Sequence, residues 1–119
     1  MNTPLKDLTF VVFDTETTGL DPAKDRILEI AAIAFRLDGQ VLGQFATLID
    51  HGLPVPQEIS DINGITAAMC AGAPSIRQAM ALFSEFLSAN WARDRELVGV
   101  AHNAPFDCAF LWHAVSEWG

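Results

Sequence analysis

The chain is poor in positive charge and in cysteine, and it has no long hydrophobic run. It carries 7 lysine and arginine residues against 15 aspartate and glutamate residues, which gives a net charge of −8. This balance argues against a membrane surface and against the broad phosphate-binding surface expected of a nucleic-acid binder. It does not exclude an acidic metal site, at which bound cations supply the positive charge. No apolar stretch approaches the length of a membrane span or of a signal-peptide core, so no membrane association is expected.

The two cysteines, Cys70 and Cys108, have neither the spacing of a metal site nor that of a disulfide framework. We therefore expect two free thiols and a reducing, cytoplasmic location. Half of the 119 residues are hydrophobic and only 18% are charged, which favours a folded core over disorder. A chain of this length is expected to form a single domain over residues 1–119.

The chain is organised around an apolar run, Phe10–Phe13, that leads directly into Asp14 and Glu16. Such a run, with a polar stop at Gly19, predicts a buried strand. Side chains alternate along a strand, so the two carboxylates should point to the same face. Like charges at a strand end repel one another and lose hydration, and paired hard oxygen ligands suit Mg²⁺ or Mn²⁺. A capping aspartate beside a solvated glutamate is the plainer alternative, and the Thr-Thr-Gly exit favours the metal site.

The rest of the pattern predicts an α/β domain with the element order βββαβα. The Asp38-Gly39 turn joins strands into a three-strand meander, with the first strand inside the sheet. A strand over 97–101 follows a helical crossover and should therefore lie parallel to the first. The spacing of Ile76, Met80, Phe83 and Leu87 predicts the buried face of a helix rather than a cofactor site. The expected elements are strands over 8–14, 27–37, 40–49 and 97–101, loops over 17–26 and 50–63, a short helix from Ile65 through Cys70, a longer helix from Ser75, and a last helix capped by Asn103.

Parallel neighbouring strands end at the same edge of a sheet, where open α/β sheets place their sites. The acids after the first strand should therefore converge with Asp107, which falls in the first turn of the last helix. Three carboxylates could hold one or two divalent ions, whose coordination a substrate phosphate would complete. Two ions about 3.5–4 Å apart stabilise the attacking and leaving oxygens of a phosphoryl displacement. The sequence thus predicts a site for phosphoryl chemistry at Asp14, Glu16 and Asp107.

Three segments, read together, resemble the DEDD-type (DEDDh) 3′–5′ exonuclease family. They are Phe-Asp-Thr-Glu-Thr-Thr-Gly over 13–19, Asn-Gly-Ile-Thr over 63–66, and His-Asn-Ala-Pro-Phe-Asp over 102–107. The first and third are specific as a pair, whereas either alone would be weak. Within the family, the pattern is most similar to the proofreading epsilon subunits of bacterial DNA polymerase III, and it covers essentially the whole chain.

The resemblance implies a ribonuclease H-like mixed sheet with helices packed on it, and two Mg²⁺ or Mn²⁺ ions. It also implies that 5′-mononucleotides are released from single-stranded DNA 3′ ends, with a replicative DNA polymerase subunit as a partner. Asp14, Glu16 and Asp107 match the family's catalytic, metal-binding acids by position. Leu20 is interpreted as an apolar wedge against a base, and Asn63 stands where the family often has histidine. The positions expected to bind substrate are Thr15, Thr17, Thr18, Gly19, Leu20, Ile65, Thr66, Asn103 and Phe106.

The family's third motif, a histidine base and a fourth metal-binding aspartate on a later helix, has no match before Gly119. We therefore expect an incomplete exonuclease domain that lacks the last strand and helix. Loss of a general base costs on the order of 10²–10⁴ in rate, so weak or absent hydrolysis is expected. His51, His102 and His113 are interpreted as surface or packing residues.

Two alternatives remain open. The first motif also fits RNA exonucleases of the ribonuclease T or oligoribonuclease type, since only contacts to the 2′-hydroxyl separate the substrates. A non-catalytic module that binds a polymerase through the edge of the 97–101 strand is the other alternative. The 63–66 and 102–107 segments favour DNA.

Overall fold

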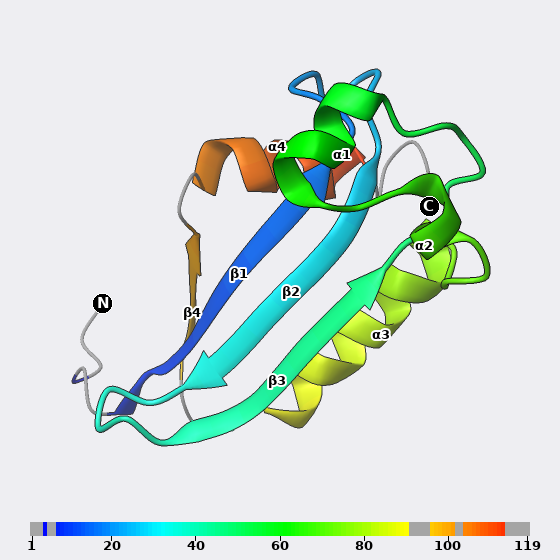
Figure 1. Cartoon of the computed structure of the whole chain (residues 1–119). Coiled ribbons are helices and arrows are strands. Elements are labelled where there is room, and N and C mark those ends of the chain that lie inside the picture. The colour runs from blue at the N-terminus through cyan, green and yellow to red at the C-terminus, as the bar shows by residue number, and fades with distance from the viewer. Residues whose placement is uncertain (1–3, 5–6, 91–95, 102–103, 114–119) are drawn as a thin grey trace.

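The computed structural model describes residue 4 and residues 7–90, 96–101 and 104–113. Its four strands are β1 (Thr9–Thr17), β2 (Ile27–Phe35), β3 (Val41–Leu48) and β4 (Leu97–Ala101), in the sheet order β3-β2-β1-β4. β1 and β2 pair antiparallel, as do β2 and β3, whereas β4 runs parallel to β1 (Figure 1). The expected mixed sheet, with the first strand in its interior, is confirmed.

β1 is longer than predicted, because it continues through both acidic residues to Thr17. The pairing explains the extension. Asp14 lies opposite Ala31 and Glu16 lies opposite Glu29, and the register shifts only after Glu16. The two acids are therefore held by strand geometry rather than by a loop, which fixes the faces to which they point.

Four helices complete the described structure: α1 (Gln57–Asn63), α2 (Ala67–Cys70), α3 (Ile76–Ala89) and α4 (Ala104–His113). The expectation of a loop over 50–63 is wrong in its second half, where α1 lies. α1 has seven residues, none of them fully buried, and only Ile59 and Ile62 are apolar, which is too short a pattern to predict a helix. It ends at Gly64, whose φ of 75° is the left-handed conformation that glycine adopts without strain.

α3 begins where the sequence predicts. The Ser75 hydroxyl accepts from the Gln78 N–H and the Gln78 side chain accepts from the Ser75 N–H, which is a capping box. The buried face of α3 presents Ala79, Phe83 and Phe86 to the sheet. The remaining residues of the predicted stripe, Ile76, Met80 and Leu87, pack against the same core.

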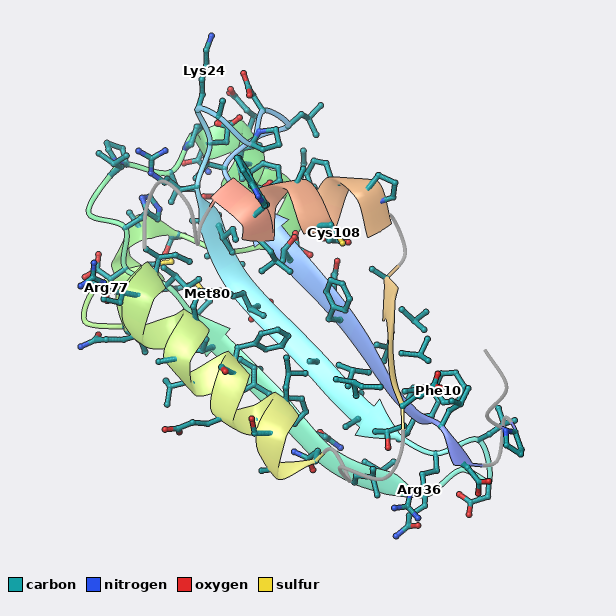
Figure 2. All side chains as sticks on the ribbon, turned by 180° about the vertical axis from the view of Figure 1, so that it is seen from behind. Phe10, Lys24, Arg36, Arg77, Met80 and Cys108 are labelled. Atoms are coloured by element: carbon teal, nitrogen blue, oxygen red, sulfur yellow. The ribbon has the colours of Figure 1, made fainter. Side chains whose placement is uncertain are left out.

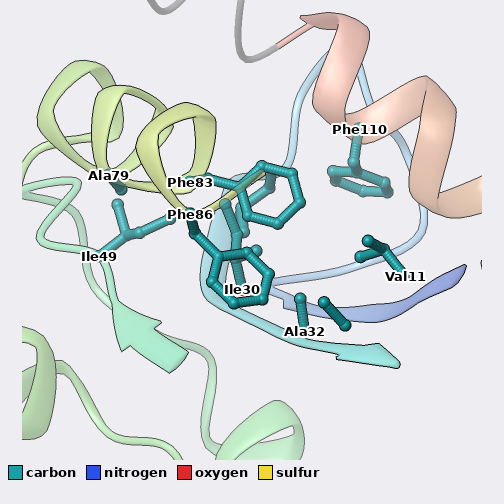
Figure 3. Packing of buried hydrophobic residues seen from close by; sticks show 10 residues of the cluster. Val11, Ile30, Ala32, Ile49, Ala79, Phe83, Phe86 and Phe110 are labelled. Carbon is teal, nitrogen blue, oxygen red and sulfur yellow. The ribbon is translucent and has the colours of Figure 1, made fainter. Parts of the chain in front are cut away.

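The two faces of the sheet are covered differently. In Figure 2, α3 and α4 lie in front of the strands, and Figure 3 shows Phe83, Phe86 and Phe110 pointing from these helices toward the strand residues Val11 and Ala32. We call this side the inner face. The opposite side, the outer face, carries alternate residues of the same strands, such as Val12 and Ile33, which are 38% and 39% exposed.

A smaller core lies at one end of the sheet, beside α1 and α2 (Figure 1). It consists of Leu28, Ile65 and Cys70, with Ile59 of α1 packed against it. Cys70 is a buried free thiol and Cys108 an exposed one, as expected. No helix in the described part of the chain has both the length and the apolar character needed to span a membrane.

Candidate active site

Asp14 and Glu16 extend from the outer face near the end of β1, and Thr15 between them faces inward. Asp14 is exposed, Thr15 is only 6% exposed and Glu16 is half-buried, which is the alternation of a strand. Asp14 borders a shallow hollow of about 290 Å³ on the outer face, which Val12 and Ile33 also line. The two carboxylates therefore share one face, as the sequence predicts.

Asp107 reaches β1 from the other side. It lies in the first turn of α4 and is 2% exposed. Its Oδ1 accepts a hydrogen bond from the Thr15 N–H at 3.3 Å and a short one from the Thr15 hydroxyl at 2.5 Å. Hydrogen bonds to a charged acceptor are stronger than neutral ones, so this contact fastens α4 to the one residue that separates the two outer acids. The predicted convergence of the two elements at this end of the sheet is present.

The charges at this end of the sheet act on one another. Burial has the largest effect and raises the pKa of Glu16. The negative charges of Asp14, Glu29 and Asp107 raise it further, with Asp14 having the largest effect of the three and Asp107 the smallest. A side-chain hydrogen bond from Asn63 opposes these effects and lowers the pKa of Glu16. Glu29 was not singled out in the sequence, because its proximity to Glu16 depends on the β1–β2 register, which no local pattern specifies.

The predicted metal site comprises Asp14, Glu16 and Asp107. Among the residues that the structure describes, no group of three histidine, cysteine, aspartate or glutamate side chains is arranged to hold a metal ion. Asp14 and Glu16 lie on the outer face, Asp107 is hydrogen-bonded to Thr15 between them, and the charge of Asp107 acts on Glu16. Hard oxygen donors and excess negative charge do fit a divalent cation at Asp14 and Glu16. Metal binding by all three residues stays a prediction.

The loop that follows β1 is held together by its own hydroxyls. Thr17 donates to the Gly19 carbonyl at 2.6 Å, and the Thr18 hydroxyl donates to Asp25 Oδ1 at 3.1 Å while accepting from the Arg26 N–H at 2.9 Å. A Cβ at Gly19 would overlap the Asp25 carboxylate, so a larger residue there would displace that carboxylate from its hydrogen bonds to the Thr18 hydroxyl and the Asp21 N–H. Both threonine hydroxyls thus have a local structural role, and their contact with substrate stays a prediction.

Leu20, the expected wedge, is 84% exposed on the same loop. An apolar side chain this exposed, on a braced loop next to the acids, is available to a ligand. Its role as a wedge stays a prediction.

The other positions expected to bind substrate differ from one another in burial and in contacts. Ile65 is 5% exposed and its side chain packs with Leu28 and Cys70 in the smaller core, and substrate contact at this position stays a prediction. Thr66 is exposed, but its hydroxyl accepts from the Met69 N–H at 3.2 Å as the N-cap of α2. Phe106 is half-buried against Phe110 at a ring distance of 4.8 Å. Asn103 and His102 lie outside the described residues.

Solved structures of exonuclease I have the same arrangement of strands and helices. The zinc-bound form of E. coli exonuclease I in complex with single-stranded DNA superimposes with a TM-score of 0.75, over 89% of this chain and 23% of that chain, at 21% identity. This likeness establishes a ribonuclease H-like fold. The family model for exonucleases of the ribonuclease T type matches residues 11–119, and the chain belongs to this DEDD-type exonuclease family.

Curated relatives agree with this assignment. A DNA polymerase III subunit epsilon-like protein of Rhodobacter capsulatus is 47% identical over 111 residues, which is 92% of this chain and 15% of that protein. The DNA polymerase III subunit epsilon of Treponema pallidum is 40% identical over 104 residues, 87% of this chain and 45% of that protein. The chain thus spans less than half the length of either relative.

Proposed function

We propose that the chain carries out 3′–5′ removal of nucleotides from single-stranded DNA ends, with Asp14, Glu16 and Asp107 as the catalytic acids. The observation that carries this proposal is the hydrogen bonding of Asp107 to Thr15. It joins an acid that is 92 residues distant in sequence to the strand position between the other two. The relatives include a DNA polymerase III subunit epsilon that is 40% identical over 104 residues, which supports DNA as the substrate.

The residues have distinct tasks in this proposal. Asp14 and Glu16 would bind divalent Mg²⁺ or Mn²⁺ through hard carboxylate oxygens, and the like charges that raise the pKa of Glu16 would be offset there. When bound, such ions supply charge stabilisation for the attacking and leaving oxygens of phosphodiester hydrolysis. Asp107 would be the third acid and anchors α4 to β1. Leu20 would contact the terminal base with its exposed side chain.

The test compares two substitutions that remove one negative charge each. Asp14→Asn changes the proposed site, whereas Asp38→Asn changes an exposed turn residue that binds the Gln40 N–H in the β2–β3 hairpin. A 5′-labelled single-stranded DNA is incubated with Mn²⁺ and each protein, and Mn²⁺ binding is measured by calorimetry. We expect slow shortening of the DNA from its 3′ end, lost in Asp14→Asn and kept in Asp38→Asn, and the same order for Mn²⁺ binding.

Two results would overturn the proposal. One is shortening that survives Asp14→Asn unchanged. The other is a wild-type chain that neither shortens DNA nor binds Mn²⁺ more tightly than Asp14→Asn does. An RNA oligomer of the same base sequence, run in the same assay, measures the substrate class: faster loss of RNA would replace DNA by RNA in the proposal.

The names of the relatives also support a polymerase as the source of the DNA end. In the described structure β4 is an edge strand, paired on one side with β1, and an edge strand is a ready surface for strand addition by a partner. Co-elution of this chain with a polymerase III catalytic subunit on size-exclusion chromatography is expected, and separate elution at micromolar concentration would count against this partner.

A further inference from the structure

The loop between β1 and β2 extends beyond the end of the sheet, and Leu20 lies in it (Figure 1). The Leu20 side chain is 84% exposed, so its own packing does little to hold the loop in place. The order of the loop must therefore come from hydrogen bonds among the neighbouring residues. Three of these hydrogen bonds involve Asp25, a half-buried residue just before β2.

The Asp25 carboxylate joins the two ends of the bend that contains Leu20. Its Oδ1 accepts from the Thr18 hydroxyl at 3.1 Å, and its Oδ2 accepts from the Asp21 N–H at 3.0 Å. The Asp25 N–H in turn donates to the Asp21 carbonyl at 2.7 Å. Gly19 lies directly against the carboxylate, since a Cβ at Gly19 would overlap it. The carboxylate therefore occupies the inside of the bend and fixes both of its ends.

The bend is also tied to the pairing of the two strands. The Thr18 N–H donates to the Arg26 carbonyl at 2.9 Å, and the Thr18 hydroxyl accepts from the Arg26 N–H at 2.9 Å. These hydrogen bonds follow directly on the β1–β2 ladder, in which Glu16 lies opposite Glu29. The position of Leu20 relative to the acids of β1 therefore depends on Asp25, which connects the bend to this ladder through Thr18.

We propose that Asp25 is a positioning residue for substrate binding: by bracing the bend from Thr18 to Asp21, it holds Leu20 in place for the terminal base of a single strand. A loop that is ordered before binding loses less freedom when the ligand arrives, and so binds it more tightly. A carboxylate repels the phosphates of DNA, so direct contact with the substrate is not its task. This inference rests on the proposed function, because it concerns the same substrate.

The test compares Asp25→Ala, which removes both acceptors, with the matched control Asp21→Ala. Asp21 is exposed in the same loop, and its Oδ1 accepts from the nearby Ala23 N–H at 3.0 Å. Each variant removes one negative charge, and that loss by itself favours binding of a polyanion. An increase in KM therefore reports the lost brace and not the changed charge. Asp25→Asn is the conservative variant, since its amide can still accept from the Asp21 N–H and donate to the Thr18 hydroxyl.

We expect Asp25→Ala to raise KM for a 5′-labelled single-stranded DNA about fivefold. Its kcat and Mn²⁺ affinity should change by less than about twofold, because strand pairing holds Asp14 and Glu16. Asp21→Ala and Asp25→Asn should leave KM within about twofold of the wild type. In a Leu20→Ala background, Asp25→Ala should raise KM no further, since Asp25 acts through Leu20.

Four results would overturn the inference. They are an unchanged KM in Asp25→Ala, an equal rise in Asp21→Ala, a full additional rise in the Leu20→Ala background, and a loss of Mn²⁺ affinity that matches the rise in KM. The last result would mean that Asp25 supports the whole end of the sheet and not the bend.

Amide exchange measures the brace without any activity. The Asp21 N–H should exchange with solvent faster in Asp25→Ala than in the wild type, whereas the Gln40 N–H, which donates to Asp38, should not change. If the wild type shortens DNA but the Asp21 N–H exchanges at the same rate in both proteins, only the positioning role fails. If the wild type does not shorten DNA, the proposed function fails, and this inference fails with it.

Discussion

The inner and outer faces of the sheet are built from the same strands, but they differ in burial and in charge. On the inner face, α3 and α4 leave Ala32 and Phe110 at 3% exposure or less. On the outer face, Val12, Ile33 and Val100 remain about 40% exposed (38, 39 and 42%), and the acids Asp14 and Glu16 share that side. The comparison shows that stability is concentrated on one side of β1 and the charged groups on the other, with Thr15 between them.

The largest difference between the two faces should appear when one large side chain on each face is truncated to alanine. Phe110→Ala removes a side chain that is 2% exposed, and should lower the free energy of unfolding by about 3–5 kcal/mol through lost burial and the cavity left behind. Ile33→Ala, on the outer face, should cost about 1 kcal/mol or less, because its side chain is already 39% exposed. Urea unfolding followed by circular dichroism measures both values. Similar losses for the two would mean that the outer face is covered in solution.

A smaller effect is expected at the junction of the two faces. Thr15→Val keeps the shape of the side chain and its preference for a strand, but removes the hydroxyl that donates to the buried carboxylate of Asp107. The free energy of unfolding should fall by about 1–3 kcal/mol, because a buried acceptor loses a partner. Thr47→Val is the control, since the hydroxyl of half-buried Thr47 donates to the adjacent Leu48 carbonyl. The free energy of unfolding of Thr47→Val should fall by only about 0.5 kcal/mol. A larger decrease for Thr47→Val than for Thr15→Val would show that the Thr15–Asp107 hydrogen bond does not stabilise the junction of the two faces.

The smallest effect concerns His51, which belongs to neither face and serves as a reference. Burial lowers the pKa of His51, the charge of Arg26 lowers it further, and Asp50 acts in the opposite direction. A histidine whose folded-state pKa is depressed stabilises the fold above its ordinary pKa near 6.5, and this contribution is lost as the pH falls through the folded-state value. His51→Asn keeps an acceptor for the Leu53 N–H, which His51 Nδ1 binds at 3.2 Å.

In that variant, unfolding measured between pH 7.5 and 5 should depend less on pH than in the wild type. The difference should be small because the side chain is mostly solvated and water screens its charge. The opposite result would be a wild-type protein that becomes more stable as the pH falls, with this increase absent in His51→Asn. That result would mean that folding raises the pKa of His51 and does not lower it.

Much of the fold could be predicted from the sequence because its signals are local. Alternating apolar residues and the Asp38-Gly39 turn specify the meander, and Ser75 marks the start of α3. α1 could not be predicted, because a seven-residue helix with only two apolar residues, Ile59 and Ile62, is too short for a periodic pattern. The run of Pro54, Pro56 and Gly64 around it is typical of a loop.

The sequence identifies candidate site residues, but local patterns do not specify how the last helix is placed relative to them. The alternation of a strand places Asp14 and Glu16 on one side, but it does not say on which side of β1 the last helix will pack. That choice depends on tertiary packing of Phe110, which brings Asp107 to Thr15, between the outer acids. Glu29 was missed for a related reason, since its proximity to Glu16 follows from the strand register.

The unequal burial of the two cysteines gives this molecule a built-in attachment point for a reporter. Cys70 is 3% exposed and burial raises the pKa of its thiol, so little of the reactive thiolate is present at neutral pH. Cys108 is exposed on α4, directly after Asp107 (Figure 2). A maleimide dye would therefore label one position without any engineering, and its fluorescence would register changes around the third acid as ions or oligonucleotides are added.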